Sequence, residues 1–164
     1  MHYMKLNPDQ REEFLASLAN MPVFLRNVFA GLSSEQARTL GPEGTPSPLE
    51  QVWHLADLER EGFRERIRRL LSESEPHLPD FNGAKVAAER NYRALSLEVG
   101  LVWFTKARQH NLAALRTLDN ERWLLSGTQE GVGRVSLCDI PGFMSQHDLA
   151  HRIEIEAWMK SVMQ

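Results

Sequence analysis

Two histidines stand four residues apart in the stretch FMSQHDLAHRIEIEAW, residues 143–158. A helix turns by about 100° per residue, so His147 and His151 would lie on one face, about 40° apart. Phe143 and Trp158 fall on the same side, which indicates a face turned towards a core. Two imidazoles in a core are costly unless both nitrogens of each ring find partners. A shared metal ion would satisfy one nitrogen of each ring, and ordinary packing is the alternative.

Tight binding of one ion needs a third ligand, and His54 is the best candidate among the other histidines. It lies in LEQVWHLADLER, inside an expected helix, and Asp57 three residues later could accept its ring N–H. His2 is at the terminus, His77 is in an expected loop, and His110 stands alone on another expected helix. On these residues alone, a three-histidine site and three separately packed histidines both remain open.

The expected helices begin at recognisable caps. The first runs from Asn7 to Gly31, with a kink at Pro22. The second begins with Ser47 as its cap and Glu50 three residues later, which is a capping-box pattern, and it ends within residues 72–80. This second helix carries the candidate third histidine.

The second half of the chain supplies two more long helices. One is capped by Ser96 and runs to about Leu118. The last opens with Ser136 and Asp139, and Pro141-Gly142 is expected to bend or delay its first turns. A short helix is expected near residues 83–91, and a loop, LSGTQEGVGRV, at 125–135. The four tryptophans are expected to be core or pocket walls: Trp53, Trp103, Trp123 and Trp158. The pattern predicts an all-α four-helix bundle that forms one domain over residues 1–164. An up-and-down order fits the helices, and the longer connections leave other orders open.

The composition narrows the function classes. The net charge is −3, whereas proteins that track phosphates usually carry a positive excess, so nucleic-acid binding is not expected. The one local basic run, FRERIRRLL, has interleaved glutamates and is interpreted as a solvated helix face. The single cysteine, Cys138, allows no intrachain disulfide, which favours a cytoplasmic location. No signal peptide and no membrane span is expected.

Two motifs in order resemble the signatures of the DinB-like (YfiT-like) metal-enzyme superfamily. They are WHLADLE at residues 53–59 and HDLAHRIEI at 147–155. The resemblance extends over residues 21–59 and over GRVSLCDI at 133–140. It implies a four-helix bundle in which His54, His147 and His151 hold a divalent ion. It also implies a likeness to S-transferases that use bacillithiol or mycothiol, and homodimers are common in the family.

Glu154 departs from the family pattern, in which glutamine is frequent three residues after the second histidine of the last helix. A carboxylate here could be a fourth ligand, a general base, or an acceptor that orients a ligand. The motif HDLAH lacks the glutamate of HExxH, so a zinc-protease mechanism is not expected. Cys138 lies about 13 Å along a helix from His147, which is too far for a direct nucleophile–base pair.

The sequence therefore predicts a metal-dependent thiol S-transferase or hydrolase that acts on a small molecule. For an S-transferase, a low-molecular-weight thiol would be one of the substrates. The three histidines would hold zinc, nickel or iron, with Asp57 and Glu154 in support. The alternative is a non-catalytic binding or dimerisation module with a structural or vestigial ion. An open coordination position would favour the enzyme.

Overall fold

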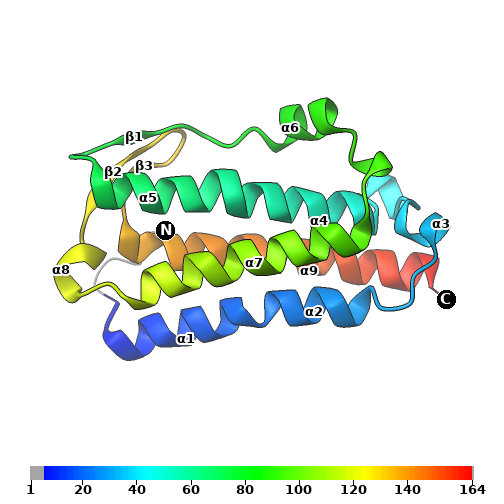
Figure 1. Ribbon diagram of the computed structural model, residues 1–164, viewed down its shortest axis with the longest axis horizontal. Helices are drawn as coiled ribbons and strands as arrows, with labels where there is room; N and C mark the ends of the chain where they lie inside the picture. The colour runs from blue at the N-terminus through cyan, green and yellow to red at the C-terminus, as the bar shows by residue number, and fades with distance from the viewer. Residues whose placement is uncertain (1–5, 164) are drawn as a thin grey trace.

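The computed structural model describes residues 6–163, which form a bundle of four helical legs (Figure 1). The first leg consists of α1 (Pro8–Ala19) and α2 (Met21–Val28). The second consists of α4 (Pro48–Asp57), the π-helical segment η2 (Leu58–Phe63) and α5 (Arg64–Ser72). The third and fourth legs are α7 (Leu97–Arg116) and α9 (Ile140–Val162). The predicted all-α four-helix bundle is confirmed.

The legs do not follow a simple up-and-down order. The first leg and α9 run in one direction, and the second leg and α7 run in the other (Figure 1). In the first leg, α1 packs against α7 and α9, and α4 of the second leg packs against the same two helices. The parallel pairing of α4 with α7 is possible because the connection between the second and third legs returns along the bundle. That connection carries β1 (His77–Leu78), α6 (Gly83–Arg90) and η3 (Tyr92–Ala94).

The predicted caps are present. Capping boxes open α1 at Asn7, α4 at Ser47 and the 3-10 turn η4 (Leu137–Asp139) at Ser136. In the first leg the break falls at Asn20, and Pro22 takes the second position of α2, where its missing N–H leaves no bond unmade. The last leg likewise begins as η4 and becomes α-helical at Ile140, which agrees with the expected delay.

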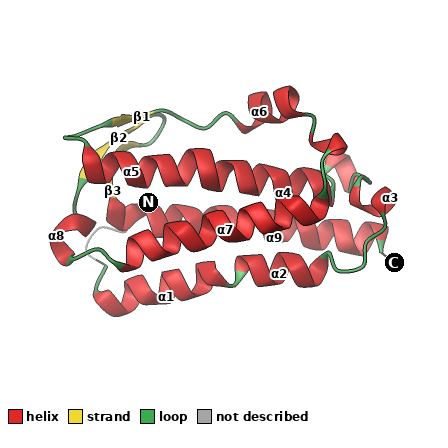
Figure 2. Ribbon diagram, in the orientation of Figure 1, coloured by secondary structure: helices red, strands yellow, loops and turns green. Residues whose placement is uncertain are grey.

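A small sheet replaces the loop expected at 125–135. β2 (Ser126–Gln129) and β3 (Gly133–Ser136) form a hairpin, and β1 pairs with β2 in parallel, as the yellow strands in Figure 2 show. Gly131 and Gly133 adopt φ angles of +78° and +101°, which permit the tight reversal. Strands this short carry too little alternation to be recognised in the sequence.

Three of the four tryptophans lie in the core, but Trp103 is 42% exposed. It is positioned on the outer face of α7, and the Arg60 guanidinium lies 4.2 Å from the centre of its ring. The expectation for Trp103 was therefore wrong. The remaining short elements are α3 (Ser34–Ala37), η1 (Pro42–Gly44) and α8 (Asn120–Trp123). Over residues 6–163, no helix has the length and apolarity needed to cross a bilayer.

Candidate metal centre

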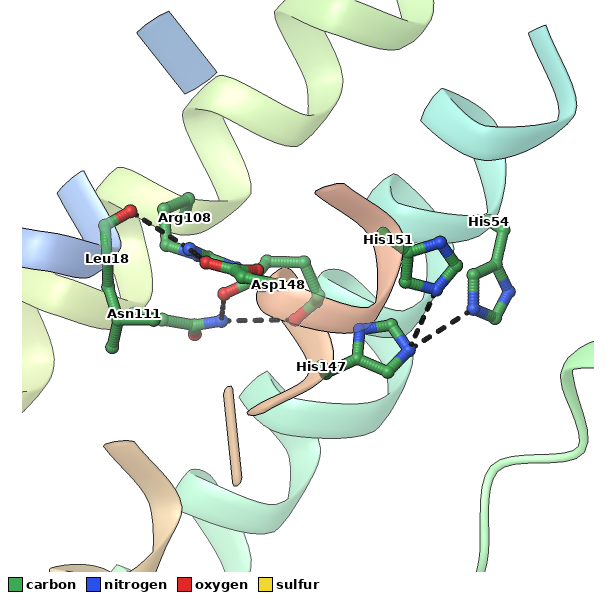
Figure 3. A network of polar contacts seen from close by, with 8 residues as sticks. Leu18, His54, Arg108, Asn111, His147, Asp148 and His151 are labelled. Atoms are coloured by element: carbon green, nitrogen blue, oxygen red, sulfur yellow. Dashed lines mark hydrogen bonds and ion pairs between the residues drawn. The ribbon is translucent and has the colours of Figure 1, made fainter. Parts of the chain in front are cut away.

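Three histidines from two legs converge on one another (Figure 3). The Nε2 atom of His147 lies 3.4 Å from that of His54 and 3.2 Å from that of His151. One ring nitrogen from each residue lies within 4.8 Å of the others. The structure therefore brings together all three residues that the sequence proposed as ligands.

The spacing of these nitrogens fits a single small ion. In a tetrahedral zinc site with Zn–N bonds of about 2.0–2.1 Å, neighbouring nitrogens lie about 3.3 Å apart. Both measured Nε2–Nε2 distances at His147 agree with this value. Without a shared cation, three nitrogens so close could satisfy one another only in part, because each ring has one donor when neutral. The donor set thus suits a divalent ion.

Gln51 orients the ring of His151. Its Oε1 lies within hydrogen-bond distance of His151 Nδ1, and its Nε2 donates to Glu154 at 2.7 Å. A carboxylate only accepts, so the amide NH₂ of Gln51 must face Glu154 and its oxygen must face His151. The Nδ1 of His151 therefore carries the proton, and its Nε2 lone pair is left for an ion. Gln51 escaped the sequence analysis, although it precedes His54 by three residues on the same helix face.

The two carboxylates expected to support the site have different surroundings. Glu154 lies on the Nδ1 side of His151, 3.7 Å from that atom, and not at the three converging nitrogens. Asp57 accepts a hydrogen bond of 2.6 Å from Tyr92 and lies 2.9 Å from Arg90. Asp57 thereby fixes η3 and the end of α6 against α4. Its role as a base or as an orienting group for His54 stays a prediction.

The other cysteine and histidine residues considered from the sequence do not belong to the cluster. Cys138 is buried in the core, and His77 and His110 are exposed. His2 lies outside the described residues. The three converging histidines are the only group of this kind found between residues 6 and 163.

Burial keeps the three imidazoles neutral. Desolvation, together with repulsion from positive charge on His151 and His54, lowers the pKa of His147 to about 3. Desolvation likewise lowers the pKa of His151 to about 4 and lowers that of His54. At neutral pH all three rings are therefore unprotonated and available as ligands, so an ion need not displace their protons.

A cavity of about 260 Å³ opens onto His54 and His151. Its other walls are contributed mainly by Glu50, Gln51 and Glu154 on one side and by small or aromatic residues of the α6 region on the other, including Gly83, Ala84, Ala87 and Tyr92. A side chain at Gly83 would bring its Cβ within 2.8 Å of His54 Cε1, so only glycine lets α6 approach the ring this closely. His54 and His151 therefore face a space that a small molecule can enter.

Comparison with known proteins identifies the family. The profile of the DinB superfamily matches residues 11–155. The chain belongs to the DinB superfamily. The likeness that the two histidine motifs indicated is thereby confirmed.

This DinB-superfamily chain is also similar to individual proteins. The chain is 31% identical over 91 residues, or 56% of its length, to a Geobacillus thermodenitrificans protein named for an inferred metal-dependent hydrolase activity. The chain matches about half (51%) of that protein. Among solved structures, YfiT from Bacillus subtilis, described as a "probable metal-dependent hydrolase with an unusual four-helix bundle topology", superposes with a TM-score of 0.86. That match covers 96% of this chain and 90% of YfiT at 17% identity, so it establishes the fold.

Replacing Gln51 by leucine is expected to weaken ion binding by roughly 10–100-fold, the usual cost of removing a group that orients a metal-binding histidine. The substitution leaves the Nδ1–H of His151 without its acceptor and Glu154 without its donor. Titration of metal-free protein with Zn²⁺ in competition with a chromophoric chelator measures the effect. Gln109→Leu, at an exposed position of α7, is the control and should bind as the unaltered protein does.

The metal-free protein is expected to lose stability as the pH falls from about 7.5 to 5. In the unfolded chain the histidines take up protons near pH 6.5, whereas in the folded protein His147 and His151 stay neutral until about pH 3 and 4. The unfolded state therefore binds more protons over this range, and each of these two histidines costs about 1–2 kcal/mol by pH 5. Urea unfolding in the presence of a chelator measures the slope, which should become shallower in His147→Ala.

Proposed function

We propose that this chain is a metal-dependent hydrolase of small molecules in which His54, His147 and His151 hold one divalent ion. The observation that carries the proposal is the convergence of three neutral imidazole nitrogens at the edge of a 260 Å³ cavity. A divalent ion with three protein nitrogens keeps an open position, where it lowers the pKa of bound water and polarises a carbonyl. Zinc, nickel and iron all suit this donor set.

The residues around the cluster have distinct proposed roles. Gln51 holds His151 in the tautomer that leaves Nε2 free. Glu154 lines the cavity and is the proposed proton acceptor, because Tyr92 and Arg90 already engage Asp57. The α6 region limits the size of the substrate, since its alanines form the opposite wall of the cavity.

Thiol transfer is the finer prediction from the family resemblance, and the same open position would accept a thiolate instead of water. In that case a low-molecular-weight thiol would be the co-substrate, and Glu154 would accept the thiol proton. Homodimer formation and a cytoplasmic location also stay predictions.

The test begins with protein stripped by a chelator and reloaded with Zn²⁺, Ni²⁺ or Fe²⁺. Each form is assayed with p-nitrophenyl acetate, with a small anilide, and with cysteine plus an alkyl chloride. Metal-dependent release of nitrophenol or aniline supports the hydrolase, and consumption of thiol and alkyl chloride without hydrolysis supports the transferase. A retained ion with no turnover of any substrate would favour the non-catalytic module. Glu154→Gln should slow turnover by about 100-fold or more, the usual contribution of a general base, with ion binding largely kept.

A further inference from the structure

Arg66 is an exception within the basic run of α5. Its neighbours Arg68 and Arg69 are exposed to different degrees and each makes a close ion pair, with Glu65 and Glu73. The side chain of Arg66 is only 9% exposed, and its closest carboxylate, on Asp80, is 4.0 Å away. The run is therefore not wholly the solvated face that the sequence predicted.

The guanidinium of Arg66 is poorly satisfied. Its Nε is buried and has no hydrogen-bond partner within the described residues. Asp80 is 71% exposed and already accepts a hydrogen bond of 2.9 Å from the backbone of Phe81. A buried cation without a close counter-charge is costly, so its presence calls for an explanation.

The other acidic groups around this guanidinium are engaged elsewhere. Arg66 lines a small hollow of about 60 Å³ between α5 and the segment that follows β1. Glu61 on this hollow pairs with Arg90 through two hydrogen bonds of 2.7 and 2.8 Å. Glu65 is held by Arg68 at 3.0 Å. The hollow has the volume of about two water molecules, which is enough for a carboxylate or phosphate group.

The hollow lies near the histidine cluster, although none of its lining residues also lines the 260 Å³ cavity. The Arg66 guanidinium lies 5.4 Å from the centre of the Phe63 ring, and that ring meets the edge of His147 at 6.3 Å between centres. The guanidinium carbon is thus within about 12 Å of the His147 ring. Phe81, on the wall of the hollow, lies 6.5 Å from the His54 ring.

We propose that Arg66 is an anion-binding residue of this site, which receives a carboxylate or phosphate group carried by the substrate. The planar guanidinium would bind two oxygens of such a group, one through its unpartnered Nε–H and the other through a terminal N–H. The exposed Asp80 would give way, because its contact with Arg66 is long. That the bound anion is part of a substrate rests on the proposed hydrolase function, but anion binding by Arg66 does not require the metal ion. It assigns the substrate to the class of small anionic esters or amides.

The first experiment separates the subsite from catalysis. Metal-free protein is titrated with acetate and with inorganic phosphate while the Nε–H resonance of Arg66, assigned by its loss in Arg66→Met, is followed by NMR. We expect saturable shifts of that resonance, and binding that is weaker by roughly tenfold or more in Arg66→Met. Arg66→Lys should recover part of the affinity because it keeps the charge but loses the paired donors. Arg64→Met, at an exposed position of α5, should bind as the unaltered protein does.

The second experiment uses metal-loaded protein and two matched esters, monomethyl succinate and dimethyl succinate. Arg66→Met should raise KM for the anionic ester by roughly tenfold and leave KM for the neutral ester unchanged. Equal effects on both esters, or anion binding by metal-free Arg66→Met as tight as in the unaltered protein, would overturn the proposal. If neither ester is hydrolysed, the proposed function fails, and the binding measurement alone decides the role of Arg66. Arg66→Met should fold, since it removes a poorly paired buried charge.

Discussion

Replacing His147 by alanine is expected to abolish stoichiometric binding of a divalent ion. His147 is central to the cluster, because its Nε2 lies within 3.4 Å of the corresponding atoms of His54 and His151. Loss of this ligand should weaken binding by more than the roughly 100-fold typical for loss of a residue that only orients a ligand. Elemental analysis of protein purified without a chelator, and titration with Zn²⁺, measure the effect.

Stability gives an independent reading of the same variant. An ion present at 1,000 times its Kd stabilises a folded protein by about 4 kcal/mol, and this gain should disappear in His147→Ala. Without the ion the variant should be about as stable as the unaltered protein at neutral pH, because the clustered ring nitrogens satisfy one another only in part. His110→Ala, at an exposed position of α7, is the matched control and should keep both the ion and the gain. Full ion content in His147→Ala would remove the basis of the proposed function.

The helical frame could be predicted because its determinants are local. Asn7, Ser47 and Ser136 each satisfy the free N–H groups of a helix start, and the structure uses all three as capping boxes. The pairing of His147 with His151 is equally local, since a helix places residues four apart on one face. His54 joins them only through tertiary packing, so its place depended on the family resemblance.

Other features depend on contacts between segments that are distant in the chain. Gln51 reaches His151 across 100 positions, and its place three residues before His54 does not reveal that the ring it orients belongs to another leg. Trp103 has the residue type of a core position, yet the face of α7 on which it lies is turned outward. Arg66 lies in a run whose neighbours pair along the same helix, so periodicity predicted the same for it. In each case the packing of one leg on another decides the environment, and a sequence read helix by helix does not contain that register.

A buried ionic network fixes the packing of the legs against one another near the site. Arg108 of α7 is 1% exposed and donates to both carboxylate oxygens of Asp148 at 2.8 and 2.9 Å, and to Glu59 at 2.9 Å. It also donates to the backbone carbonyl of Leu18, as Figure 3 shows. Asn111 donates to the second oxygen of Glu59 at 2.8 Å. Asp148 follows His147 directly, so the network ties the ligand-bearing turn of α9 to the other legs.

Arg108→Met is therefore expected to destabilise the protein by about 3–5 kcal/mol. Removing the cation leaves Glu59 and Asp148 buried as two carboxylates without their counter-charge, and breaking a buried pair from one side has this cost. Urea unfolding at neutral pH measures the change. The control is Arg116→Met, on the same helix as Arg108, which breaks an exposed ion pair with Glu12 of α1. It should cost no more than about 1 kcal/mol.

The triple variant Arg108→Met, Glu59→Gln, Asp148→Asn separates the charge from the packing. If the loss in Arg108→Met comes from the uncompensated carboxylates, neutralising them should restore most of the stability. The triple variant lacks the forked contacts that hold α9 to α7 and the second leg, so its histidines should bind Zn²⁺ more weakly even when it is stable. Unchanged Zn²⁺ affinity in a stable triple variant would show that the helices position His147 without the network. A stability loss that persists in the triple variant would assign it to packing of the long arginine side chain.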